Sequence, residues 1–184
     1  FILTIELFAL ILIYFKIADK YNIIDKPNHR SAHTEITLRG GGVIFWFASL
    51  LYFVQHFHEN YLFFIGITLV SLVSFWDDIQ SLPNRIRLFT QFLAISLVLY
   101  GLGIFALFPW WGIAIVYVMA IGIINAYNFM DGINGITGLY TLAVLGSFLY
   151  VNHYVITFSD FDFIVYPMVA SAVFCSLIIE KKPN

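Results

Sequence analysis

Seven apolar runs, each close to the length of a membrane-spanning helix, constrain this chain more than any other feature of its sequence. A spanning helix needs about 20 mostly apolar residues. The runs that qualify cover residues 1–18, 41–57, 61–76, 88–108, 110–128, 137–157 and 163–179. Only 11% of the residues are charged, too few to cover the surface of a water-soluble domain. The sequence therefore predicts an all-α fold, a polytopic transmembrane helix bundle of about seven spans in one integral membrane domain over residues 1–184.

The lysines and arginines indicate how these spans are oriented. All of them lie in or beside the break at 19–40, the break at 77–87 and the C-terminal tail. The positive-inside rule places these segments in the cytoplasm and the N-terminus outside. Alternation along the chain then puts the break at 129–136 on the cytoplasmic side as well. We expect the three breaks to meet at one site facing the cytoplasm.

The most polar of these regions follows directly on the run at 110–128. Asn125 and Asn128 are three residues apart and share a helix face, and Asp131 can join them if the helix loosens. Polar side chains at such a depth are costly and usually functional. Their oxygens are the ligands that Mg²⁺ prefers, commonly together with substrate phosphates. An ordinary Asn/Gly turn is the alternative, but it does not explain Asn125 inside an apolar run.

A second polar segment, Asp77-Asp78, ends the run at 61–76. Adjacent carboxylates can hold a hard cation, or one of them can act as a base. They are placed unfavourably at a helix C-terminus, where the helix dipole is negative. Helix stability therefore does not explain why two carboxylates occur at this position. The alternative is an acidic helix end that stops the span and caps the loop.

Cationic side chains are available in the other two breaks. His33 and Arg39 precede three consecutive glycines in the loop at 19–42, and Arg85 and Arg87 follow the acidic pair. Cations can neutralise phosphate oxygens, and glycines let backbone N–H groups approach them. The alternative is a basic loop that touches anionic lipid.

Three motifs in this order resemble the polyprenyl-phosphate N-acetylhexosamine-1-phosphate transferase superfamily, also called glycosyltransferase family 4. They are Asp25-x-Pro27-x-x-Arg30-x-x-His33 leading to Arg39-Gly40-Gly41-Gly42, then Asp77-Asp78, then Asn125-x-x-Asn128-x-x-Asp131-Gly132-x-Asn134-Gly135. The resemblance covers nearly all of the chain. The Arg-Gly-Gly-Gly form is more similar to the GlcNAc branch than to the MurNAc-pentapeptide branch.

The resemblance implies a Mg²⁺-dependent phosphotransferase in the bacterial inner membrane, with Mn²⁺ as a possible substitute. Such an enzyme transfers sugar-1-phosphate, here GlcNAc-1-phosphate, from a UDP-N-acetylhexosamine to undecaprenyl phosphate and releases UMP. The product serves cell-envelope polysaccharides such as lipopolysaccharide. The implied partners are the UDP-sugar, undecaprenyl phosphate and the lipid bilayer, with no nucleic acid. So much apolar surface is also compatible with a homodimer.

The residue roles follow position by position. Asp77 and Asp78 match paired aspartates implicated in activating the carrier phosphate, and Asp131 completes the catalytic set. Asn128 and Asp131 match positions at the metal and the diphosphate. The substrate-binding candidates, with Asn134 placed near the uracil, are Asn125, Asn128, Asn134, His33, Arg39 and Arg85.

The chain also departs from the superfamily. A Gly-Asp-x-Gly-Ser-type motif and a later histidine-rich loop are missing, and the first residue is not Met. We therefore expect an N-terminal portion of a longer protein, inactive on its own. The main alternative function is a membrane transporter with an intramembrane Asn/Asp site. The acidic residues lie at the ends of the runs rather than at mid-membrane, and no inverted repeat is visible, which favours the enzyme.

Overall fold

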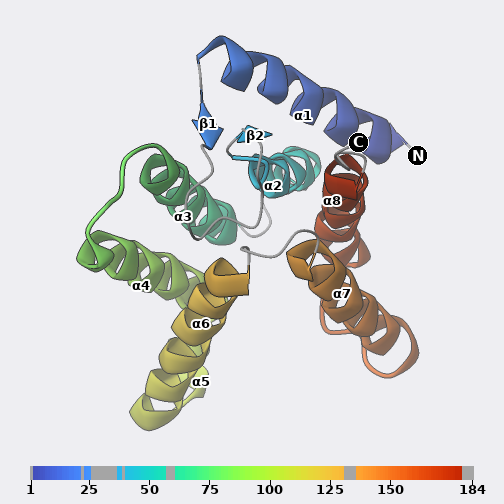
Figure 1. Cartoon of the computed structure of the whole chain (residues 1–184). Coiled ribbons are helices and arrows are strands. Elements are labelled where there is room, and N and C mark those ends of the chain that lie inside the picture. Colours follow the sequence, from blue (N-terminus) through green and yellow to red (C-terminus); the bar gives the residue numbers. More distant parts are fainter. Residues whose placement is uncertain are drawn as a thin grey trace. The chain divides into compact units, whose positions relative to one another are not determined.

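The computed structural model describes residues 2–21, 23–25, 37–38, 40–56, 61–130 and 136–179, and these residues are almost entirely helical (Figure 1). The helices are α1 (Ile2–Lys20), α2 (Val43–Gln55), α3 (Tyr61–Ile79), α4 (Asn84–Gly101), α5 (Ile104–Leu107), α6 (Trp110–Met130), α7 (Ile136–Tyr154) and α8 (Phe161–Ile179). Two short strands, β1 (Ile24–Asp25) and β2 (Thr37–Leu38), pair antiparallel. The predicted all-α fold is confirmed.

Each predicted apolar run contains a long helix, but the run at 88–108 is not one continuous helix. It is divided into α4 and α5 at Gly103, whose φ of 68° lies in the left-handed region that favours glycine. In addition, α4 begins at Asn84, directly after Pro83, rather than at residue 88. The start of α4 lies within a few residues of the predicted run, but the prediction of one continuous span to residue 108 was wrong, because hydropathy does not report where the backbone turns.

The exposed surface fits a membrane environment. Of the described helices, α3 and α6 are each long and apolar enough to cross a membrane, and shorter apolar helices cover Val43–Gln55 and Phe161–Leu177. Side chains of α6 such as Val118 and Phe129 remain 73% and 85% exposed. A continuous apolar surface of this kind is unfavourable in water and favourable against lipid. The chain is therefore a membrane helix bundle.

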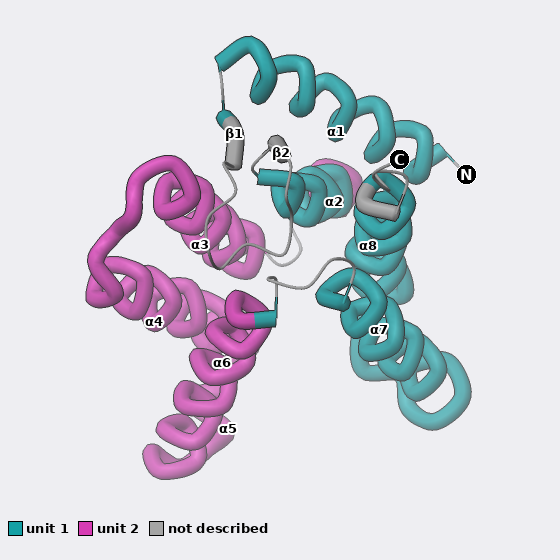
Figure 2. Tube along the Cα trace, in the orientation of Figure 1, with its two compact units in different colours: residues 1–52, 130–184 teal, residues 53–129 magenta. Residues whose placement is uncertain are grey.

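The chain forms two compact units, shown in Figure 2: residues 1–52 with 130–184, and residues 53–129. In the first unit, α1 buries a stripe of residues that recurs every three or four positions, namely Leu7, Ile11, Tyr14 and Ala18. The ring of Phe45 on α2 lies 5.8 Å from that of Phe174 on α8, and the rings of Tyr52 and Phe163 are 5.4 Å apart. Aromatic contacts therefore join α2 to α8.

Asn152 organises the connection between α7 and α8. Its side chain is buried, and its Oδ1 accepts hydrogen bonds from the backbone N–H groups of Phe158 (2.8 Å) and Ser159 (3.0 Å). Its Nδ2 donates to the Ser159 carbonyl at 3.0 Å. One carboxamide therefore pairs three backbone groups that would otherwise lack partners next to the helix ends.

We expect Asn152→Ala to destabilise this connection by about 1–2 kcal/mol, because partly buried backbone groups lose their partners. Asn152→Asp keeps the two accepted bonds and loses the donated one, so its effect should be smaller. Thermal unfolding of the purified variants in detergent measures both. Equal melting temperatures for Asn152→Ala and the wild type would contradict this role.

The second unit contains α3, α4, α5 and most of α6. Gly66 lets α3 approach α4 closely, since a Cβ at this position would lie 3.1 Å from the carbonyl oxygen of Ala94. α4 and α6 are joined by a 2.6 Å hydrogen bond between Ser96 Oγ and Tyr117 OH, and the Tyr117 ring stacks on Phe92 at 4.6 Å. These contacts hold three helices together around one pocket.

Candidate functional site

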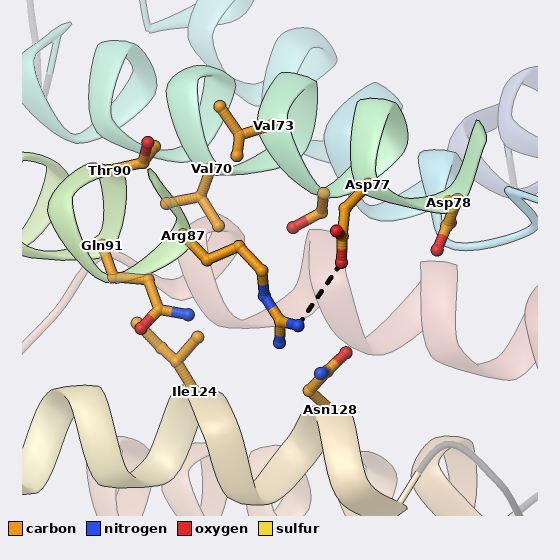
Figure 3. A pocket seen from close by; sticks show the side chains of 10 residues that line it. Val70, Val73, Asp77, Asp78, Arg87, Thr90, Gln91, Ile124 and Asn128 are labelled. Carbon is orange, nitrogen blue, oxygen red and sulfur yellow. Dashed lines mark ion pairs between the residues drawn. The ribbon is translucent and has the colours of Figure 1, made fainter. Parts of the chain in front are cut away.

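A polar pocket of about 220 Å³ lies within the second unit, between α3, α4 and α6 (Figure 3). Each helix contributes residues at helical spacing, so that one face of each helix lines it. The lining residues are Val70, Val73, Ser74, Asp77 and Asp78 of α3, Arg87, Thr90 and Gln91 of α4, and Ile124 and Asn128 of α6. Apolar side chains therefore form one part of the wall, and carboxylates, carboxamides, hydroxyls and a guanidinium form the rest.

Asp77 is held in place by two donors, one from the α3–α4 connection and one from the first turn of α4. Its Oδ1 accepts a 2.7 Å hydrogen bond from the backbone N–H of Leu82, and its Oδ2 forms an ion pair with Arg87 Nη1 at 3.4 Å. Both side chains are about three-quarters buried. The two donors offset the unfavourable position of a carboxylate in the last turn of a helix. They also orient Asp77 toward the pocket.

Asp78 and Asn128 extend the polar part of the wall. Both residues are exposed, and both line the same pocket as Asp77 (Figure 3). The acidic pair at the end of α3 and the first part of the 125–135 segment, which are far apart in sequence, are thus brought together. Oxygen ligands and a cation side by side are suited to an anionic ligand that carries a hard metal ion.

The helical register distinguishes the two arginines of the 77–87 break. Arg87 lies four residues before Gln91, so both share the face of α4 that lines the pocket. Arg85 is exposed and is not among the lining residues. Arg85 was the substrate-binding candidate from sequence, whereas the structure places Arg87 in the pocket.

Gln91 is a pocket residue that the sequence reasoning missed. Its side chain is only 7% exposed. The sequence does contain a feature that could have identified it: Gln91 is a polar residue inside the apolar run at 88–108, four residues after Arg87. A buried amide in an apolar run needs partners, as does an intramembrane asparagine, and the same reasoning that selected Asn125 applies to Gln91.

Asn125 does not line the pocket and instead joins two helices. Its Nδ2 donates to Gln91 Oε1 at 3.0 Å and to the backbone carbonyl of Ile121 at 2.8 Å. This is the arrangement expected of a polar side chain in a helix bundle, where interhelical hydrogen bonds satisfy buried amides. Asn125 thus contacts Gln91, a lining residue, without being one itself.

Four predicted site residues lie outside the described residues: His33, Arg39, Asp131 and Asn134. Their roles stay predictions. Of the two predicted metal ligands, Asn128 and Asp131, the structure describes Asn128.

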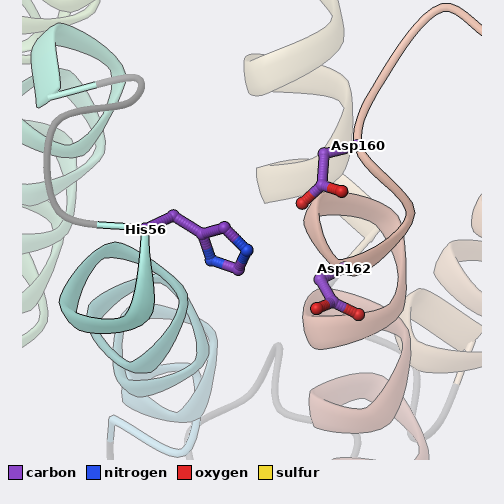
Figure 4. Close-up of side chains that lie close together, drawn as sticks. All are labelled: His56, Asp160 and Asp162. Atoms are coloured by element: carbon purple, nitrogen blue, oxygen red, sulfur yellow. The ribbon is translucent and has the colours of Figure 1, made fainter.

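A second group of ionisable side chains appears in Figure 4. Asp160 and Asp162 lie at the beginning of α8, the end of a helix where negative side chains are stabilised by the helix dipole. His56 follows the end of α2 and belongs to the other compact unit. Helix electrostatics explains the acidic pair, and no ligand site is assigned to it.

The fold defines a membrane helix bundle with a pocket between three of its helices, lined by both charged and apolar side chains. Residues 60–179 match the sequence model of Glycosyl transferase family 4. The match covers more than half of the chain and includes every residue that lines the pocket. The chain belongs to this family, and the resemblance inferred from its motifs is confirmed.

One curated relative is similar over much of the chain. Undecaprenyl-phosphate alpha-N-acetylglucosaminyl 1-phosphate transferase of Yersinia pestis is 30% identical over 141 residues, which cover 67% of this chain and 38% of that protein. The chain thus spans well under half the length of this relative. No solved structure matches the chain.

Proposed function

We propose that this protein transfers a sugar-1-phosphate, most specifically GlcNAc-1-phosphate, from a UDP-N-acetylhexosamine to undecaprenyl phosphate. An oxygen of the lipid phosphate attacks the phosphorus that carries the sugar, and the bond from that phosphorus to the bridging oxygen of the diphosphate breaks. UMP leaves, and a lipid-linked diphospho-sugar remains. The observation that carries the proposal is one membrane pocket that joins Asp77, Asp78, Arg87 and Asn128 within the family match.

The electrostatics of the pocket suit this reaction. Both reactants are anions, so their approach requires positive charge, and Arg87 supplies it beside Asp77. Charge stabilisation by fixed donors and cations is usually the largest contribution to such catalysis. An aspartate can also keep the acceptor phosphate deprotonated, because the second pKa of a phosphate monoester is about 6. Asp78, the more exposed of the pair, is the better placed to meet a substrate.

The pocket also fits a divalent metal ion. Asp78 and Asn128 both line it, and their side chains carry carboxylate and carboxamide oxygens, the kind of ligand that Mg²⁺ prefers. Asn128 would hold the ion together with Asp131, as the motif implies, and Mn²⁺ has a similar preference. When bound, Mg²⁺ would neutralise diphosphate charge as a Lewis acid.

The location of the pocket supports a membrane-surface reaction. Asp77 and Asp78 lie in the last turn of α3, a helix long and apolar enough to cross a membrane. An acceptor phosphate on a lipid tail is presented at this depth. We propose that the site faces the cytoplasm at the bacterial inner membrane, where the UDP-sugar is available, and that the product enters cell-envelope polysaccharide synthesis.

The decisive experiment measures UMP release by membranes that express the full reading frame containing this chain. With UDP-GlcNAc, undecaprenyl phosphate and Mg²⁺, we expect UMP and a lipid-linked diphospho-sugar in equal amounts. EDTA should abolish both, and added Mg²⁺ or Mn²⁺ should restore them, because the metal neutralises the diphosphate. Sugar-nucleotide uptake into vesicles without UMP release would instead support the transporter alternative.

A further inference from the structure

The orientation of the Asn125 amide follows from a backbone contact. The atom 2.8 Å from the Ile121 carbonyl must be the nitrogen, because a carbonyl oxygen can only accept a hydrogen bond. This removes the usual ambiguity between the oxygen and nitrogen of a side-chain amide. The same nitrogen lies 3.0 Å from the Gln91 side chain, so Gln91 must present its oxygen to Asn125.

The orientation of Gln91 follows in turn. With its oxygen turned to Asn125, its NH₂ group and the two hydrogen-bond donors that it carries lie on the opposite side. Figure 3 shows this nitrogen on the side of Arg87. Within the described part of the chain, the bond from Asn125 is the one hydrogen bond that the Gln91 side chain makes. This nitrogen is not among the buried side-chain atoms that lack a partner in the described part of the chain, so it keeps some accessible surface. Gln91 lines the pocket, where a ligand can accept a hydrogen bond from it.

The arrangement on α4 places two kinds of donor together. Arg87 and Gln91 lie four residues apart on the face that lines the pocket. A guanidinium beside a neutral amide offers several N–H donors, which suits the closely spaced oxygens of a phosphate. Arg87 is already paired with Asp77 at 3.4 Å. The NH₂ group of Gln91, in contrast, donates no hydrogen bond to a carboxylate of the described wall.

We propose that Gln91 donates a hydrogen bond to a phosphate oxygen of the substrate, and that Asn125 is a positioning residue that holds the Gln91 amide in the required orientation. The inference rests on the proposed function and deepens it. Phosphate oxygens occur on both the UDP-sugar and the lipid acceptor, and the kinetic constants of the two substrates distinguish these sources.

Two nearly isosteric variants test the orientation. Gln91→Glu still accepts the hydrogen bond from Asn125, but it loses the pocket-facing donors and adds negative charge. Asn125→Asp removes the donor to Gln91, so the Gln91 amide turns its nitrogen toward the new carboxylate and its oxygen toward the pocket. We expect each variant to raise the KM of one phosphate-bearing substrate about tenfold or more. Each variant also places a carboxylate where an amide lay and should lower the melting temperature, but KM does not depend on the fraction of the protein that is folded.

A double-mutant cycle separates positioning from direct contact. In a Gln91→Met background, Asn125→Asp should cause little further loss, because the residue through which it acts is already gone. If Asn125 touches the substrate itself, the two losses should multiply. Multiplying losses would overturn the positioning role, and a KM for both substrates within about twofold of wild type in Gln91→Glu would overturn the donor role.

Binding measurements keep this test separate from that of the proposed function. If the wild type releases no UMP, the transfer reaction is wrong, and the pocket can still be probed with undecaprenyl phosphate and with UDP on purified protein in nanodiscs. Wild-type binding that weakens about tenfold in Gln91→Glu and Asn125→Asp supports the donor assignment. Equal binding by all three proteins, or no binding by the wild type, refutes it.

Discussion

Replacing Arg87 with Met should lower kcat for sugar-phosphate transfer by about 10²–10³-fold, the usual effect of removing one charge-stabilising donor. Arg87 is the cation among the described lining residues, and it pairs with Asp77 at 3.4 Å. Under the proposed function, its loss removes positive charge from the place where the two anionic substrates would meet, and it leaves Asp77 with the Leu82 N–H as its remaining donor of the two. UMP release by membranes containing the variant measures the effect.

Arg85→Met is the matched control. The two arginines are neighbours on the first turn of α4, but Arg85 is exposed and lies outside the pocket. We expect a change of no more than about threefold, typical of a surface substitution. Arg87→Lys keeps the charge without the planar guanidinium, so partial activity is expected. Equal losses for Arg85→Met and Arg87→Met would contradict the placement of Arg87 in the site.

The second large effect concerns the contact between α7 and α8. Gly138 is buried, and a Cβ built on it would overlap Cys175 Sγ. Gly138→Val should destabilise the folded protein by roughly 3 kcal/mol, the upper part of the usual range for overpacking. Gly138→Ala should cost less, because alanine favours the helix by about 1 kcal/mol relative to glycine. Unfolding of the purified variants in detergent gives the free energies.

Two further variants identify the cause. Gly146 lies on the same helix, and a Cβ added there would have nothing within 4 Å, so Gly146→Val should leave stability nearly unchanged. Cys175→Ala removes the sulfur that the new side chain meets, and it should therefore recover part of the stability lost in Gly138→Ala. An additive double variant would show that the two positions do not interact.

Apolar runs and polar interruptions were sufficient to predict most of the helices. A run of about 20 apolar residues has few alternatives to a helix in lipid, because every backbone N–H and C=O must be paired within the segment. The same principle identified Asp77, Asp78 and Asn128 as costly exceptions, and the structure gathers these three around one pocket. The break at Gly103 escaped prediction, because its signal is a backbone angle rather than hydropathy.

The sequence by itself determined the membrane class, the helical segments and the polar residues that needed an explanation. Only the tertiary structure decided which of the polar residues come together. Arg87 rather than Arg85 lines the pocket, and Asn125 forms a hydrogen bond with the lining residue Gln91. The physical reason is that hydropathy along a helix that is apolar on all sides marks no preferred face. The face that meets a neighbour is set by side-chain packing between helices that are distant in sequence, such as α4 and α6.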